Sequence, residues 1–110
     1  MRYLVAGSGG PGFASDEEAL EILSNIVLPN FSRLIELEKK KKIIAGGLPV
    51  GDRSFIFIVE AESNDELDKM LRQLPMWGIL DWEVTPLQTF SERAKQEQLA
   101  VKDLKKTLEK

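Results

Sequence analysis

The sequence predicts an α+β domain with the element order β-α-β-β-α-β, an antiparallel sheet and an extra helix at the C-terminus. Two Ser-x-x-Glu stretches, residues 15–18 and 63–66, have the spacing of a capping box and predict the starts of two helices. Short apolar runs flank both helices, bounded by glycine and proline as strands are. The length of 110 residues suffices for one domain with a hydrophobic core.

The composition excludes several classes of function. Cys and His are both absent, which excludes disulfides, thiol catalysis, His-based triads and the usual zinc sites. The 15 basic and 18 acidic residues give a net charge of −3, so we expect no nucleic-acid partner. No apolar run approaches the about 18 residues of a membrane span, and residues 3–6 are too short for a signal-peptide core. We therefore expect a cytoplasmic protein with no membrane partner.

The first half of the chain begins with a strand, residues 2–7, and a glycine-rich loop. A helix follows, because its apolar residues recur with a helical period. Pro29 interrupts this helix, since it lacks an amide donor and collides with the carbonyl group of Asn25. We expect a kink or a split near residues 27–28.

Two strands come next. Residues 43–48 predict the second strand, with Gly46 and Gly47 at a bulge or at a close approach of two backbones. Residues 49–52 predict a turn, and residues 53–61 predict the third strand.

The remaining elements complete the order. A second helix begins at Ser63, and Pro75 ends it. Residues 80–87 predict the fourth strand, and residues 91–110 predict a charged helix. This order is that of the ferredoxin-like fold. We expect residues 1–90 to form that domain and residues 91–110 to form a helical extension.

The third predicted strand is apolar on both faces. One face has Phe55, Phe57, Val59 and Ala61, and the other has Ile56 and Ile58. Both helices of this fold cover one side of the sheet, which leaves the other side as an exposed apolar patch. The sequence therefore predicts a homodimer at least, with the sheet of a second copy over this side, as in a dimeric α+β barrel. The alternative is that the C-terminal helix folds back over it.

A glycine motif, Gly7-x-Gly9-x-x-Gly12, formally resembles a dinucleotide-binding fingerprint. Its mechanism needs free amides and a positive helix end facing a pyrophosphate. Here Pro11 has no amide, and the acidic residues 16–18 crowd that helix end. We interpret the motif as a flexible connection that can also act as a mobile lid.

The fourth predicted strand alternates between apolar and polar side chains. Asp81 and Glu83 lie on one face, and Trp82 lies on the other. The face with the two carboxylates is either the wet side of an edge strand or the lining of a cleft. In a cleft, a carboxylate whose pKa is raised by burial is the natural base of a chain without histidine.

Three segments with fixed spacings resemble the C-terminal half of the muconolactone delta-isomerase family: Glu62-Ser-Asn-Asp-Glu-Leu67, Leu71-x-x-Leu74-Pro75 and Asp81-x-Glu83-Val-Thr-Pro-Leu87. The resemblance implies a ferredoxin-like fold in which two subunits press their sheets together, and larger rings of such dimers. It also implies the migration of a double bond in a small lactone acid during the breakdown of aromatic compounds, without a metal or an organic cofactor.

Such a reaction needs a base, donors for the enolate oxygen and a cation for the substrate carboxylate. The candidate residues are the bases Glu83 and Asp81, the anion-binding residues Arg53 and Lys42, and the cleft walls Trp77 and Trp82. The rival hypothesis is a non-catalytic oligomeric module that binds a small ligand or serves as a scaffold. Enclosure of one carboxylate beside a cation favours the enzyme, and exposure of both carboxylates to water favours the rival.

The C-terminal helix has a sparse apolar seam. Ala94, Val101, Leu104 and Leu108 lie on it, and Glu97 interrupts it. A helix with so little apolar surface is marginal in water on its own. We expect it to dock on a neighbouring subunit or to stay partly frayed rather than to enter its own core.

Overall fold

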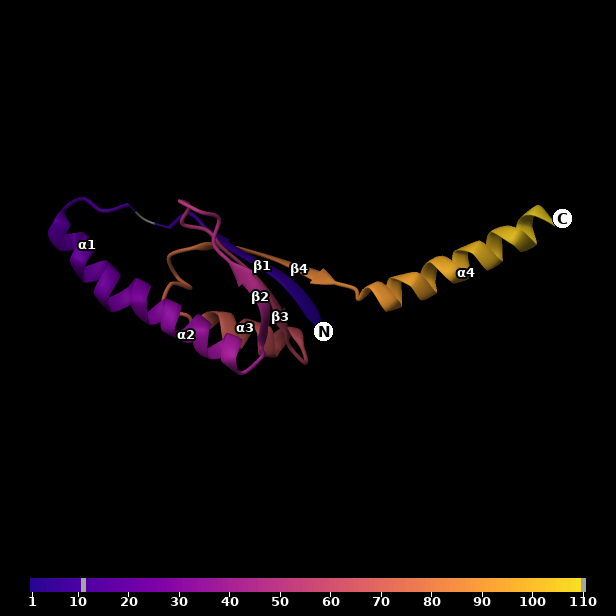
Figure 1. Ribbon diagram of the computed structural model, residues 1–110, viewed down its shortest axis with the longest axis horizontal. Helices are drawn as coiled ribbons and strands as arrows, with labels where there is room; N and C mark the ends of the chain where they lie inside the picture. The colour runs from indigo at the N-terminus through magenta and orange to yellow at the C-terminus, as the bar shows by residue number, and fades with distance from the viewer. Residues whose placement is uncertain (11, 110) are drawn as a thin grey trace.

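The computed structural model describes residues 1–10 and 12–109. Its strands are β1 (Arg2–Ser8), β2 (Ile43–Gly47), β3 (Phe55–Glu60) and β4 (Asp81–Leu87). Its helices are α1 (Asp16–Ile22), the π-helix η1 (Leu23–Val27), α2 (Leu28–Lys39), α3 (Asn64–Arg72) and α4 (Phe90–Leu108). The strands form one antiparallel sheet in the order β2-β3-β1-β4, with α1, α2 and α3 on one side (Figure 1). The predicted α+β fold class is confirmed.

Two residues fall outside the described ranges. Pro11 belongs to the glycine motif, and Lys110 is the last residue of the predicted extension. Within the described ranges, no helix is both long enough and apolar enough to cross a membrane.

The first helix is divided where Pro29 predicts a break. The π-helix η1 ends at Val27, and α2 begins at Leu28 with Pro29 in its first turn. The amide of Leu28 donates a hydrogen bond to the carbonyl group of Leu23, five residues earlier. The helix therefore continues through one wide turn, in which the hydrogen-bond ladder shifts by one residue just before Pro29, which has no amide to donate.

Both predicted capping boxes are present. The hydroxyl group of Ser15 accepts a hydrogen bond from the amide of Glu18 at 3.1 Å, and Ser63 does the same for Glu66 at 3.1 Å. The carboxylate of Glu66 in turn accepts from the amide of Glu62, one residue before the cap, at 2.8 Å. These bonds satisfy amides that a helix start leaves without partners.

The second strand contains a bulge at Ile44, two residues before the glycine pair. Ile43 pairs with Val59 and Ala45 pairs with Ile58, so Ile44 is the extra residue. Gly46 is instead the point of close approach, since a Cβ atom there would lie 2.5 Å from the carbonyl oxygen of Ile56. Of the two predicted alternatives for the glycine pair, a bulge or a close approach of two backbones, the structure has the close approach at Gly46.

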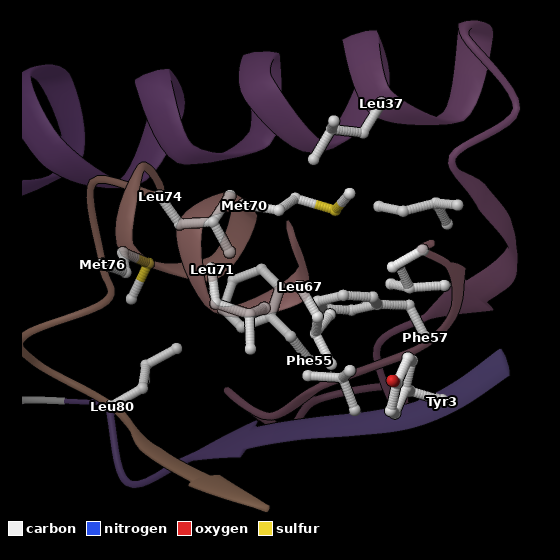
Figure 2. Packing of buried hydrophobic residues seen from close by; sticks show 14 residues of the cluster. Tyr3, Leu37, Phe55, Phe57, Leu67, Met70, Leu71, Leu74, Met76 and Leu80 are labelled. Carbon is white, nitrogen blue, oxygen red and sulfur yellow. The ribbon is translucent and has the colours of Figure 1, made fainter. Parts of the chain in front are cut away.

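The hydrophobic core lies between the sheet and the helices. Tyr3 on β1 and Phe57 on β3 point toward Leu37 of α2 and Met70 of α3 (Figure 2). All four side chains are buried. The face of β3 that bears Phe55, Phe57 and Val59 is therefore the core face.

The opposite side of the sheet, called the outer face below, bears the exposed apolar side chains Leu4, Ile56 and Leu87 and the half-buried Ile58. Helix α4 does not cover it, because α4 projects away from the end of β4 (Figure 1). No residue of α4 is buried. The alternative in which this helix folds back over the sheet of its own chain is wrong.

Asn30 is the buried polar residue of the core, with 1% of its surface exposed. Its side-chain oxygen accepts a hydrogen bond from the amide of Met76 at 3.1 Å, which ties α2 to the segment before β4. Because Asn30→Ala leaves that buried amide without a partner, we expect the free energy of unfolding to fall by about 1–3 kcal/mol. Urea unfolding measures it, with Asn25→Ala on the exposed side of η1 as the control. Equal losses in both variants would contradict this role.

Candidate functional site

A cavity of about 180 Å³ lies between the divided first helix and the start of β3. Its apolar walls include Ile22, Leu23, Val27, Phe31, Phe55 and Met76. Asp52 and Arg53 also line it, and both residues are exposed, so they lie at its mouth. Engineered apolar cavities of about 150 Å³ bind benzene, so this cavity is large enough for a small ring.

The turn before β3 positions the two charged residues. The amide of Asp52 donates a hydrogen bond to the carbonyl group of Pro49 at 3.0 Å, which confirms the predicted turn. One oxygen of the Asp52 carboxylate accepts from the amide of Arg53 at 2.6 Å and from the hydroxyl group of Ser54 at 3.3 Å. The carboxylate is therefore held in place by the two residues that follow it.

The glycine-rich loop lies against this mouth. A Cβ atom at Gly10 would lie 3.6 Å from the Cβ atom of Arg53, and the guanidinium carbon of Arg53 lies 5.4 Å from the centre of the Phe13 ring. Gly10 and Phe13 both line the cavity. The glycine-rich loop, predicted as a flexible connection, thus forms part of the cavity wall. Its action as a lid stays a prediction.

Asp81 and Glu83 lie elsewhere. Glu83 pairs with Ala6 of β1 and is exposed on the outer face, away from the helices. Asp81 is also exposed, and its carboxylate would lie 3.3 Å from a Cβ atom at Gly9. Gly9 faces Asp81 and the adjacent Gly10 faces Arg53, so these two charged residues occupy the same end of the sheet. The cavity contains neither predicted base.

Trp77 and Trp82 do not line this cavity but pack against other parts of the chain. Trp82 is half-buried, meets the ring of Phe57 edge-on at 6.4 Å and covers Gly7, where a Cβ atom would come within 2.8 Å. Its indole nitrogen donates a hydrogen bond to the carbonyl group of Trp77 at 2.9 Å. The Trp77 ring lies 4.6 Å from the guanidinium carbon of Arg72, a cation–π contact.

Lys42 lies at the opposite end of the sheet from Arg53. Its ammonium group forms a 2.8 Å ion pair with Glu66, the capping residue of α3. Their hydrogen bond raises the pKa of Lys42 and lowers the pKa of Glu66. Of the two predicted anion-binding residues, only Arg53 is at the cavity.

Sequence reasoning missed Asp52, Phe13 and most of the apolar walls. The signal for Asp52 is the charged pair Asp52-Arg53 directly after a turn and before an apolar strand. The walls have no such signal, because Phe31 and Met76 are 45 positions apart and meet only in the fold. An apolar pocket with one cation and one carboxylate at its mouth suits a small ring compound with an anionic group.

Two of the solved structures that match this chain show what it is similar to. Muconolactone isomerase superposes with a TM-score of 0.67 at 18% identity, covering 81% of this chain and 90% of its own. The 5-chloro-2-hydroxyhydroquinone dehydrochlorinase of Burkholderia phenoliruptrix AC1100, in complex with 2,5-dihydroxybenzoquinone, gives a TM-score of 0.60 at 23% identity and covers 84% of this chain and 98% of its own. Both show the same fold. No curated protein matches the sequence significantly.

A family model identifies the chain more directly. The model of muconolactone delta-isomerase matches residues 19–93, which include β2, β3, α3 and β4. It also includes Asp52, Arg53, Asp81 and Glu83, and it leaves out the glycine-rich loop and most of α4. Because the match spans more than half of the chain, the chain belongs to the muconolactone delta-isomerase family.

Proposed function

We propose that the protein is a cofactor-independent isomerase that moves a double bond in a small unsaturated lactone or a related ring acid. The supporting observation is the apolar cavity with Arg53 at its mouth. In this arrangement the ring of the substrate enters the cavity, and the guanidinium group of Arg53 binds its carboxylate, for which its planar donors are well suited. The breakdown of aromatic compounds is the proposed setting.

The relatives support a substrate of this size. One is named for muconolactone, and the other acts on a chlorinated hydroxyhydroquinone and was solved with a dihydroxybenzoquinone. All of these are small oxygenated rings. Isomerisation by double-bond migration takes a proton from a carbon next to an unsaturated carbonyl group and returns it elsewhere on the same system, so it requires a base near the ring.

Asp52 is the proposed base, because it shares the mouth of the cavity with Arg53. Glu83, followed by Asp81, is the second proposal. These two residues lie on the outer face, outside the cavity, so either could act as a base only where a second copy forms a substrate site over that face.

A second candidate function is non-catalytic binding of the same kind of ligand. The exposure of both Asp81 and Glu83 favours it. In that case the cavity beside Arg53 binds the ring acid without turnover. Binding and turnover measured on one preparation separate the two functions.

The test of the proposed cavity is Arg53→Gln. Because a hydrogen bond between ions contributes about 1.5–3 kcal/mol, we expect the KM or the Kd for muconolactone to rise about tenfold to a hundredfold. The absorbance of the shifted double bond measures turnover, and calorimetry measures binding. Arg72→Gln is the matched control, since Arg72 stacks on Trp77 outside the cavity. An Arg53→Gln protein with an unchanged KM and Kd would refute this binding site.

A further inference from the structure

Helix α4 has 19 residues and an exposed apolar surface that its own chain leaves uncovered. Phe90 is 96% exposed, Leu104 is 61% exposed and Leu108 is 85% exposed. Gln88, which precedes the helix, makes side-chain hydrogen bonds to Arg93 and Gln96. These bonds brace the first turns of the helix where it leaves the sheet (Figure 1).

The apolar residues of α4 follow a heptad pattern. The seam consists of Phe90, Ala94, Glu97, Val101, Leu104 and Leu108, at successive intervals of four, three, four, three and four residues. Such intervals keep one stripe of a helix facing a partner helix. Leu99 and Ala100 lie off the seam. Leu99 is two residues from Glu97 and two from Val101, which places it about 200° round the helix from both.

The spacing of the seam positions is the same in both directions along the helix. Its six positions are symmetric about residue 99, so two copies in opposite directions would match each seam residue with another. Phe90 would meet Leu108 of the second copy, Ala94 would meet Leu104, and Glu97 would meet Val101. We infer that α4 pairs with α4 of a second copy of this chain as an antiparallel two-helix coil.

Charge favours the antiparallel direction. In a parallel pair, Glu97 would face Glu97 of the second copy inside the seam, and like charges there are destabilising. A parallel pair would also bring Lys105 and Lys106 of both copies together, whereas an antiparallel pair holds them at opposite ends. Opposed helix dipoles add to the preference. The antiparallel pair also places the small Ala94 opposite the larger Leu104.

The pairing of two α4 helices depends neither on the proposed catalytic function nor on pairing through the outer face of the sheet. Two identical helices related by a two-fold axis form an isologous interface. If the outer faces also pair, the helices join such dimers into a larger closed assembly. The pairing also gives the predicted docking of α4 on a neighbouring subunit a defined partner.

The first test compares two leucines of the same helix in the full-length chain. Leu104 and Leu99 are 61% and 60% exposed, so they differ in position on the helix and not in exposure. We expect Leu104→Gln to weaken self-association by about tenfold or more, because each pair loses two buried leucines, and Leu99→Gln to leave it unchanged. Sedimentation equilibrium measures both. Equal effects of the two variants, or no effect of either, would overturn the inference.

The second test determines the direction of pairing. The chain has no cysteine, so a single introduced cysteine can form a disulfide only with a cysteine introduced in a second copy. Ala94→Cys mixed with a larger, tagged Leu104→Cys chain should give a mixed disulfide under mild oxidation, and neither variant alone should cross-link as fast. Faster cross-linking of Ala94→Cys with itself indicates a parallel pair and overturns the antiparallel assignment. Absence of any cross-link in the associated protein indicates that α4 docks on another surface, which overturns the pairing itself.

Discussion

Asp52→Asn is expected to lower the turnover of an unsaturated lactone by about a hundredfold or more, the usual scale for loss of a general base. The amide of Asn keeps the size of the side chain and an oxygen that can accept the hydrogen bonds from Arg53 and Ser54. It cannot accept the substrate proton. We therefore expect kcat to fall while the KM, which depends on Arg53, changes little. Stopped-flow or steady-state absorbance of the shifted double bond measures both constants.

Three further variants complete this experiment. Asp103→Asn, on α4, controls for the loss of one negative charge, and thermal unfolding controls for stability. Glu83→Gln and Asp81→Asn test the outer face. A fully active Asp52→Asn protein together with an inactive Glu83→Gln protein would assign the base to Glu83 and move the substrate to the space between two subunits. Full activity in Asp52→Asn, Glu83→Gln and Asp81→Asn would eliminate every proposed base.

The fold was predictable because its signals are local. The capping boxes at Ser15 and Ser63 need only four consecutive residues, and the break at Pro29 follows from one missing amide. The alternation along β3 placed Phe57 and Ile56 on opposite faces, and the structure has Phe57 in the core and Ile56 on the outer face. Each of these predictions depends on neighbours in the sequence, which the chain itself specifies.

The site was less predictable because it depends on distant partners. The sequence around Lys42 shows no partner for its ammonium group. In the fold this group pairs with Glu66, which is 24 positions further along the chain. Arg53 was predicted and does stand at a cavity, yet the carboxylate beside it is Asp52 rather than Glu83. Strand alternation shows that Asp81 and Glu83 share a face, but it does not show which face adjoins a cavity. That depends on where α1 and η1 pack.

Ile56→Glu is expected to dissociate the predicted sheet-to-sheet dimer or to precipitate the chain. Ile56 is 40% exposed and shares the outer face with the apolar side chains of Leu4, Ile58 and Leu87, and monomers avoid large exposed apolar patches. A second copy that covers this surface would bury an unpaired carboxylate in the variant, which costs several kcal/mol. Light scattering at micromolar concentration measures the mass of the unmodified chain and of the variant.

The comparison is best made in chains that also have Leu104→Gln, so that pairing through α4 cannot hide the loss of the sheet contact. Ile35→Glu is the control, because Ile35 is 50% exposed on α2 and lies away from the outer face. We expect the Leu104→Gln chain and its Ile35→Glu derivative to remain dimers, and the Ile56→Glu derivative to become monomeric or insoluble. If the Leu104→Gln chain is already a stable monomer at micromolar concentration, the outer face does not pair, and neither Glu83 nor Asp81 is enclosed by a second copy.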